Sequence, residues 1–324
     1  MKNFYRTSYR FYKPDQKEHK IFAISDIHFS DHTTENLNQI AKKAEHQKPQ
    51  IITISGDLID SLESADEAHE IARLKAWMTR LAKVAPVCLC LGNHDFYRQP
   101  ADFKSGLSKN RHYVAERNDD FIKAIGELDN VHYLDDASFE NDEFYVFGLT
   151  LPPVYYHFDY VTEKQGSIFS PGSEDVNVLL EKLDELSEFT TKLPKKKTKI
   201  LLVHSPVHLL DEAVKAKIAE FDFVFAGHMH NGVVPPLLNE IWRGHKGIIT
   251  PSKHVFANHN TRSGLYENQL IVLGAVTTIQ KGAKPLGFLN HAFPVNYATV
   301  ETTHNEADSR RPDVRKKYEN WYKN

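Results

Sequence analysis

Five short apolar segments in this chain are each followed by side chains that can bind a metal ion or transfer a proton. The segments are rich in Ile, Val, Leu and Phe, a pattern that is typical of buried β-strands. Ligands of open α/β sheets bind beyond the carboxyl ends of the strands, so we expect the five ends to converge on one crevice. The segments, with the side chains that follow them, are 21–24 with Asp26 and His28, 51–54 with Asp57, 86–91 with Asn93 and His94, 200–203 with His204, and 221–225 with His228 and His230.

Stretches of helical composition alternate with these segments. Pro49 closes the first of them, and Pro86 follows the second. Strands that alternate with helices predict an α/β fold in which helices cover a parallel or mixed sheet. The aromatic residues 4–12 predict an edge strand, and residues 232–300 look β-rich. The predicted helices are 34–48, 64–83, 116–128, 174–193 and 209–220.

Charge excludes several classes of partner. Among the 324 residues, 40 Lys and Arg nearly balance 43 Asp and Glu, for a formal charge of −3. No strongly basic field therefore attracts nucleic acid or an anionic membrane. A membrane-surface role for the basic and aromatic residues 1–20 would need an amphipathic helix, which their Tyr, Thr and Phe content does not favour. These residues also contain no apolar core of a signal peptide or transmembrane helix, so we expect a cytoplasmic protein.

The two cysteines do not predict a disulfide framework. Cys88 and Cys90 lie one residue apart on a predicted strand, so their side chains point to the same face and have poor geometry for a bond. We expect both to be buried thiols.

The residue types at the five strand ends are those of a two-metal hydrolase. Two divalent ions about 3.5–4 Å apart clamp the attacking and leaving oxygens of a displacement at phosphorus. A carboxylate can bridge them because its two oxygens can address different ions. Mixed imidazole, carboxylate and amide ligands suit Mn, Fe, Zn or Co. Each histidine taken alone has an ordinary alternative as a hydrogen-bonded core or surface residue, but the ordered set favours a metal site.

The complete ordered set resembles the calcineurin-like metallophosphoesterase superfamily, in particular its bacterial phosphodiesterase-like members. The motifs that carry the resemblance are Asp26-x-His28, Gly56-Asp57-x-x-Asp60, Gly92-Asn93-His94-Asp95, His204 after a strand, and Gly227-His228-x-His230. The resemblance implies one α/β domain of residues 1–302, in which two packed mixed β-sheets are flanked by helices in a four-layer sandwich. Residues 96–136 would be an insert that forms a rim or lid, and residues 303–324 a charged tail.

The same resemblance implies a role for each motif residue. Asp57 would bridge two metal ions, and a metal-bridging hydroxide would be the nucleophile. His94 would donate a proton to the leaving oxygen, and Asp60 would orient His94. The remaining ligands would be Asp26, His28 and His230 for one metal and Asn93, His204 and His228 for the other.

The substrate is expected to be a small-molecule phosphoester, and the oligomeric state stays open. Ser61 follows Asp60 where the phosphoprotein phosphatases of the superfamily carry a phosphate-gripping Arg, so a phosphodiester is favoured. The alternatives are a phosphomonoesterase or nucleotide phosphatase and a non-catalytic metal-binding scaffold. Candidate substrate contacts are Tyr97, His254 and His259, for which exposed loop residues are the alternative interpretation.

Overall fold

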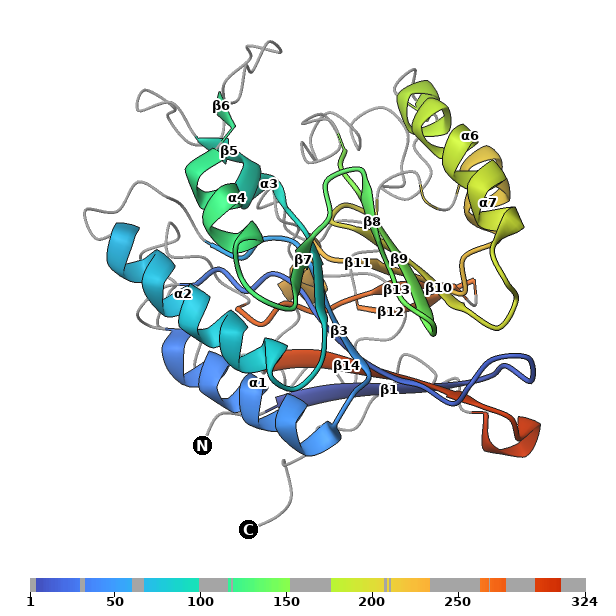
Figure 1. The fold of residues 1–324 in the computed structure, drawn as a ribbon, viewed down its shortest axis with the longest axis horizontal. Helices are drawn as coiled ribbons and strands as arrows, with labels where there is room; N and C mark the ends of the chain where they lie inside the picture. Colours follow the sequence, from blue (N-terminus) through green and yellow to red (C-terminus); the bar gives the residue numbers. More distant parts are fainter. Residues whose placement is uncertain are drawn as a thin grey trace.

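The computed structural model describes residues 4–29, 33–59, 67–98, 116–117, 119–151, 176–206, 209, 211–233, 263–267, 269–277 and 295–309. In this part of the chain, two six-stranded mixed sheets pack face to face, and helices cover their outer faces (Figure 1). The predicted architecture of two packed mixed sheets flanked by helices is confirmed.

The first sheet contains the first three segments predicted as strands. Strands β2, β3, β4 and β7 are mutually parallel, whereas β14 runs antiparallel to β2 and parallel to the edge strand β1. The predicted amino-terminal edge strand is thus present, but β14 separates it from β2. In sheet order the strands are β1 (Phe4–Tyr12), β14 (Val295–Thr303), β2 (Lys20–Ile24), β3 (Ile51–Ser55), β4 (Val87–Cys90) and β7 (Val131–Tyr133).

The second sheet contains the other two predicted segments. Strands β13, β11, β10 and β9 are parallel, and an antiparallel strand closes each edge. In sheet order the strands are β12 (Gly264–Tyr266), β13 (Leu270–Val272), β11 (Phe223–Ala226), β10 (Thr198–Val203), β9 (Phe144–Leu149) and β8 (Ala137–Glu140).

The central strands are largely apolar because both of their faces are covered. In β2, Ile21 and Ala23 pack in the core between the sheets, whereas Phe22 and Ile24 pack in the core under the helices. This division follows the two-residue period of a strand. Cys88 and Cys90 both lie between the sheets as free, fully buried thiols, as predicted, and burial raises the pKa of each.

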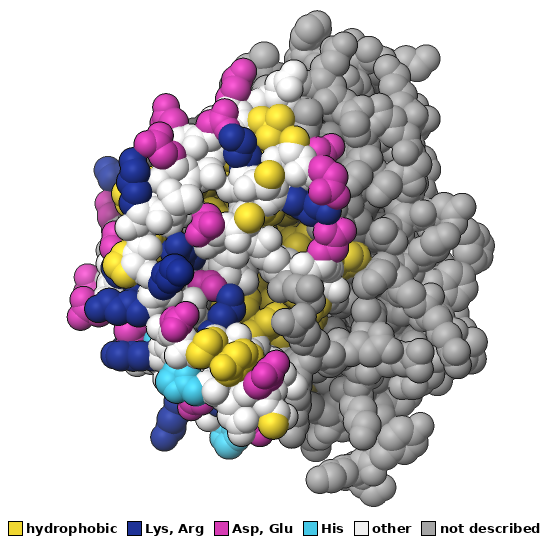
Figure 2. Space-filling model, turned by 90° about the vertical axis from the view of Figure 1, so that its right-hand side faces the viewer, with side chains coloured by type: hydrophobic (Ala, Val, Ile, Leu, Met, Phe, Trp, Pro, Cys, Tyr) yellow, Lys and Arg dark blue, Asp and Glu magenta, His cyan; other side chains and the backbone are white. Residues whose placement is uncertain are grey.

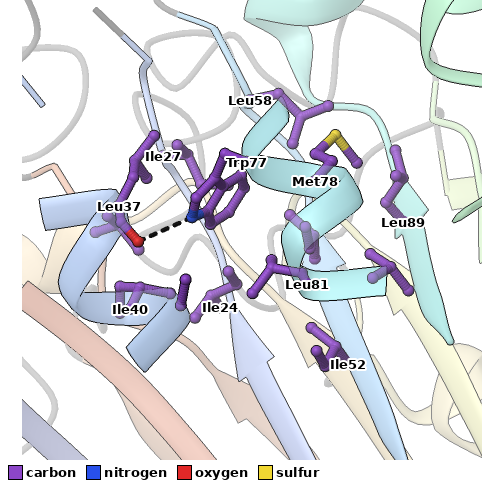
Figure 3. Packing of buried hydrophobic residues seen from close by; sticks show 14 of the residues in the cluster. Ile24, Ile27, Leu37, Ile40, Ile52, Leu58, Trp77, Met78, Leu81 and Leu89 are labelled. Atoms are coloured by element: carbon purple, nitrogen blue, oxygen red, sulfur yellow. Dashed lines mark hydrogen bonds between the residues drawn. The ribbon is translucent and has the colours of Figure 1, made fainter. Parts of the chain in front are cut away.

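Helices α1 (Thr34–Gln47), α2 (Glu67–Ala82) and α4 (Asp119–Gly126) belong to the layer over the first sheet, and α6 (Val176–Lys192) and α7 (Glu212–Ile218) to the layer over the second. Trp77 joins α2 to α1, because its indole N–H donates to the Leu37 carbonyl at 2.9 Å within this apolar layer (Figure 3). The predicted helices are confirmed, with ends that move by one to three residues.

The segment 96–136 contains one strand of the first sheet and a separate small pair of strands. Strands β5 (Tyr97–Arg98) and β6 (Glu116–Arg117) form a small antiparallel pair, so the helix predicted from residue 116 begins instead at Asp119. Strand β7 then adds to the edge of the first sheet beside β4. The division into a 1–302 domain, a rim or lid at 96–136 and a tail at 303–324 stays a prediction.

None of the helices within the described residues has both the length and the apolar character that crossing a bilayer requires. On the side of the molecule shown in Figure 2, acidic and basic side chains are intermixed over the described surface. This distribution matches the near balance of charge in the sequence.

Candidate metal centre

The predicted metal ligands follow strands of both sheets at their carboxyl ends. The first sheet contributes the residues after β2, β3 and β4, and the second those after β10 and β11. All of these side chains are buried except that of Asn93, which is partly exposed. In chain order the residues are Asp26, His28, Asp57, Asn93, His204, His228 and His230.

Six of these side chains form two groups that share Asp57. In the first group, ligand atoms of Asp26, His28, Asp57 and His230 all lie within 4.8 Å of one another, and those of Asp57, His204 and His228 do so in the second. The Asp57 Oδ2 atom is 3.6 Å from His28 Nε2 and 3.2 Å from His204 Nε2. A single carboxylate oxygen of Asp57, Oδ2, therefore lies close to imidazoles of both groups.

Asn93 offers a further oxygen ligand. Its Oδ1 atom is buried, and no hydrogen-bond donor reaches it from the described residues. Buried polar atoms are nearly always satisfied, so an oxygen in this position calls for a ligand. Together, the carboxylate, amide and imidazole donors fit a divalent transition metal.

The backbone is strained where it presents the ligands. Non-glycine residues rarely adopt positive φ, although Asp, Asn and His do so more often than others, and each such residue costs of order 1–3 kcal/mol. Such conformations persist where the surrounding structure imposes them, and they cluster at functional sites. Here they occur at Asp26 (52°), His28 (44°), Asp57 (54°), His228 (68°) and His230 (46°).

Main-chain hydrogen bonds hold the ligand loops against one another. The Asp26 N–H donates to the Gly56 carbonyl at 3.1 Å, and the His28 N–H donates to the Asp57 carbonyl at 3.0 Å. The His228 N–H in turn donates to the Asp26 carboxylate at 3.0 Å, which joins the second sheet to the first. These bonds fix the positions of the ligand loops relative to one another.

Three glycines leave room for the ligands. A Cβ atom on Gly92 would overlap Asp57 Oδ1, and one on Gly227 would lie 2.7 Å from Asp26 Oδ2. Gly56 has φ +81° and would carry its Cβ into the His204 ring. The residues before Asp57, Asn93 and His228 are therefore glycines because neighbouring carboxylates and imidazoles occupy the space that a Cβ atom would need.

Burial and charge set the protonation of the second group. Burial alone would raise the pKa of Asp57, but the neighbouring histidines, above all His204, hold it well below its usual range. Burial alone would lower the pKa of His204, but the Asp57 carboxylate raises it to about 9. The His204 Nδ1–H donates to the Ser55 carbonyl at 2.6 Å, so Nε2 is the ring nitrogen that faces Asp57.

Asp26, His28 and His228 are already in the protonation state that a metal requires. Burial lowers the pKa of His28 well below its usual value and that of His228 to about 3. Burial acts to raise the pKa of Asp26. The charge of His230 and a hydrogen bond with it act in the opposite direction, and the net shift of the pKa is downward. Both carboxylates are thus ionised, and these two imidazoles are neutral, at neutral pH.

The predicted proton donor lies at the exposed side of the same site. The His94 N–H donates to Asp57 Oδ1 at 3.1 Å, and its ring meets the His28 ring edge-on with 5.0 Å between the centroids. The proposed partner Asp60 and the candidate substrate contacts His254 and His259 lie outside the described residues. Tyr97 begins β5, and its side chain is also outside the described part.

One buried carboxylate received no role from the sequence. The Asp95 side chain accepts main-chain N–H groups from Leu58, Ile59 and Gly92, at 2.7, 3.0 and 2.9 Å. Burial, with the nearby charge of Asp57, raises its pKa to about 7. The position of Asp95 directly after His94 in the third motif was the sequence signal that could have pointed to it.

Comparison with known proteins identifies the family. The sequence model of the calcineurin-like phosphoesterases matches residues 19–232, which run from just before β2 to the end of the ligand segment after β11. This chain belongs to the calcineurin-like phosphoesterase family. The resemblance inferred from the five motifs is therefore confirmed.

Individual relatives are distant. An uncharacterized metallophosphoesterase of Campylobacter jejuni, Cj0846, is 24% identical over 226 residues, which cover 69% of this chain and 47% of the relative. This chain thus spans about half the length of that relative. Among solved structures, a dimetal phosphatase from Danio rerio is 14% identical with a TM-score of 0.47 and covers 87% of this chain and 91% of its own. TT1561 of Thermus thermophilus is 15% identical with a TM-score of 0.40, over 65% and 82%.

We expect Gly92→Ala to displace Asp57 and weaken metal binding by about 10–100-fold, the range for changes that reposition a ligand. Elemental analysis after dialysis against a weak chelator measures the loss. The matched control is Gly126→Ala at the end of α4, where nothing lies within 4 Å of the added atom. Equal metal content in the two variants would contradict the close packing of Gly92 against Asp57.

We also expect metal binding to release a proton from His204. In chelator-treated protein at pH 7, a pKa of about 9 keeps this imidazole protonated, whereas a metal ligand has to be neutral. The affinity of the second group should therefore rise about tenfold per pH unit below pH 9 and level off above it. Calorimetry in buffers of different ionisation enthalpy counts the proton, and its absence at pH 7 would refute the assignment.

Proposed function

We propose that this protein is a dinuclear metal-dependent phosphoesterase. The observation that carries the proposal is the position of Asp57 between two groups of buried ligands, one around Asp26, His28 and His230 and the other around His204 and His228. Asn93 completes the second group, since its buried Oδ1 atom is available as a ligand. When bound, two divalent ions supply Lewis-acid catalysis and lower the pKa of a water molecule to near neutrality.

The residues of the chain would bind the ions and move protons. The Asp57 carboxylate is ionised and rigidly held, because Oδ1 accepts the His94 N–H while Oδ2 faces the imidazoles. His94 lies beside the ligands and remains partly exposed, so it can reach both a substrate and solvent. We assign it the role of proton donor to the leaving oxygen, with Asp60 as the carboxylate that orients it.

We further propose that the substrate is a phosphodiester. The support for this choice is Ser61, which stands where an Arg would grip the doubly charged phosphate of a monoester. A diester carries one fewer negative charge on its phosphoryl group and has less need of such a cation. Tyr97, His254 and His259 stay candidate substrate contacts.

With protein loaded with Mn²⁺, we expect faster hydrolysis of bis(p-nitrophenyl) phosphate than of p-nitrophenyl phosphate, because the site lacks the arginine described above. Initial rates at equal substrate concentration decide the matter. The reverse order would make the protein a phosphomonoesterase. Two bound ions without hydrolysis of either ester would favour the metal-binding scaffold.

We expect His94→Ala to retain its metal and to lose about two orders of magnitude or more in kcat on an ester with a poor leaving group. An activated p-nitrophenyl ester should be affected less, because its leaving oxygen needs little protonation. Elemental analysis of the same preparation controls for metal content. An unchanged kcat on the poor leaving group would remove His94 from the mechanism.

A further inference from the structure

Asp95 is a buried carboxylate that the proposed mechanism does not use. It lies in α3 (Asn93–Phe96) and is fully buried. Its Oδ1 atom accepts the N–H groups of Leu58 and Ile59, and its Oδ2 atom accepts the N–H group of Gly92. Burying a carboxylate is costly unless hydrogen bonds compensate it, and here three main-chain donors do so.

The three donors belong to the two loops that carry the proposed bridge and the proposed acid. Leu58 and Ile59 directly follow Asp57, whereas Gly92 directly precedes Asn93. The ladder between β3 and β4 ends at the pair Ser55 and Cys90. Beyond that pair, the Asp95 carboxylate links the segment that follows β3 to the segment that follows β4, at the point where both begin to carry the proposed ligands.

On the proposed assignment, the link would act on the two ligand groups unequally. Asp57 lies with His204 and His228, and the proposed ligand Asn93 would join them, so this group would take two ligands from the linked loops. The group around Asp26 takes only Asp57, and there a separate bond, from the His28 N–H to the Asp57 carbonyl at 3.0 Å, holds that residue. A change at Asp95 would therefore disturb two proposed ligands of one ion and one ligand of the other.

We propose that Asp95 is a positioning residue, which fixes the separation of Asp57 and Asn93 and thereby sets the affinity for the ion of the second group. This inference rests on the proposed dinuclear site. A merely structural role would instead lower the stability of the fold and leave the two affinities in their original ratio.

The test is a Zn²⁺ titration of Asp95→Asn in competition with a chromophoric chelator. The amide keeps the shape of the side chain, and its oxygen can still accept from Leu58 and Ile59, but its NH₂ group then faces the Gly92 N–H. We expect one of the two binding constants to fall by about tenfold or more and the other by less than about threefold. An equal fall in both constants, or no fall in either, overturns the proposal.

Two further variants assign and control the effect. In an Asn93→Ala background, Asp95→Asn should add little to the loss of the same constant, because the two changes act on one ion. Asp222→Asn is the matched control, since the Asp222 carboxylate accepts the Lys199 N–H at 2.9 Å just before β11, at the opposite strand ends. It should leave both constants unchanged, and an equal effect in this control would overturn the proposal.

Failure to fold and failure of the enzyme proposal can each be separated from failure of this inference. Should Asp95→Asn not fold, replacing the Ile59 amide by an ester removes one donor, leaves the carboxylate in place and should give the same unequal loss. Wild-type protein that binds two ions but hydrolyses no ester would end the enzyme proposal and leave the titration valid. Wild-type protein that binds no second ion would overturn the inference.

Discussion

The contact between Asp57 and His204 joins the two sheets at the metal centre, and the rest of the site is arranged around it. Asp57 follows a strand of the first sheet and His204 a strand of the second, and their facing atoms are 3.2 Å apart with both side chains at most 1% exposed. The other ring nitrogen of His204 donates to the Ser55 carbonyl, again in the first sheet. Both ring nitrogens of His204 therefore contact residues of the opposite sheet. The packing of the two sheets thus sets the geometry of the ligands.

The composition of the inter-sheet core explains how the sandwich leaves room for this contact. Away from the site the sheets are separated by large side chains such as Phe144 and Phe223, which are buried between them. At the carboxyl ends the residues become small and polar. The Ser25 hydroxyl donates to the Ser55 carbonyl at 2.8 Å, and the Ser55 hydroxyl donates to the Phe225 carbonyl at 3.3 Å. Small hydrogen-bonded residues thus replace aromatic packing where the imidazoles have to enter.

The candidate ligand residues could be located from the sequence because each lies shortly after a strand, and a strand has a strong apolar signal. The groups that hydrogen-bond to the ligand loops have no comparable signal in the sequence. The Thr277 N–H donates to the Asp26 carbonyl at 3.0 Å, yet a main-chain donor is the same in any residue except proline. The insertion of β14 between β1 and β2 was missed for a related reason, since pairing of Phe4 with Val295 depends on chain-distant register rather than on local pattern. Asp95 lay in a recognised motif, but only the folded loops reveal which donors it accepts.

The strained backbone at the ligand residues depends on the hydrogen bonds and packing of the loops around it. Five ligand residues hold positive φ, a cost of several kcal/mol in total that hydrogen bonds and packing elsewhere in the loops have to offset. The bonds that do so, from Asp26 to Gly56 and from His28 to Asp57, run between main-chain atoms. The negative charge of Asp57 is balanced by protonated His204, which would give up its proton when an ion binds. An ion that binds the second group would therefore replace the proton of His204, between ligand loops that main-chain hydrogen bonds hold together.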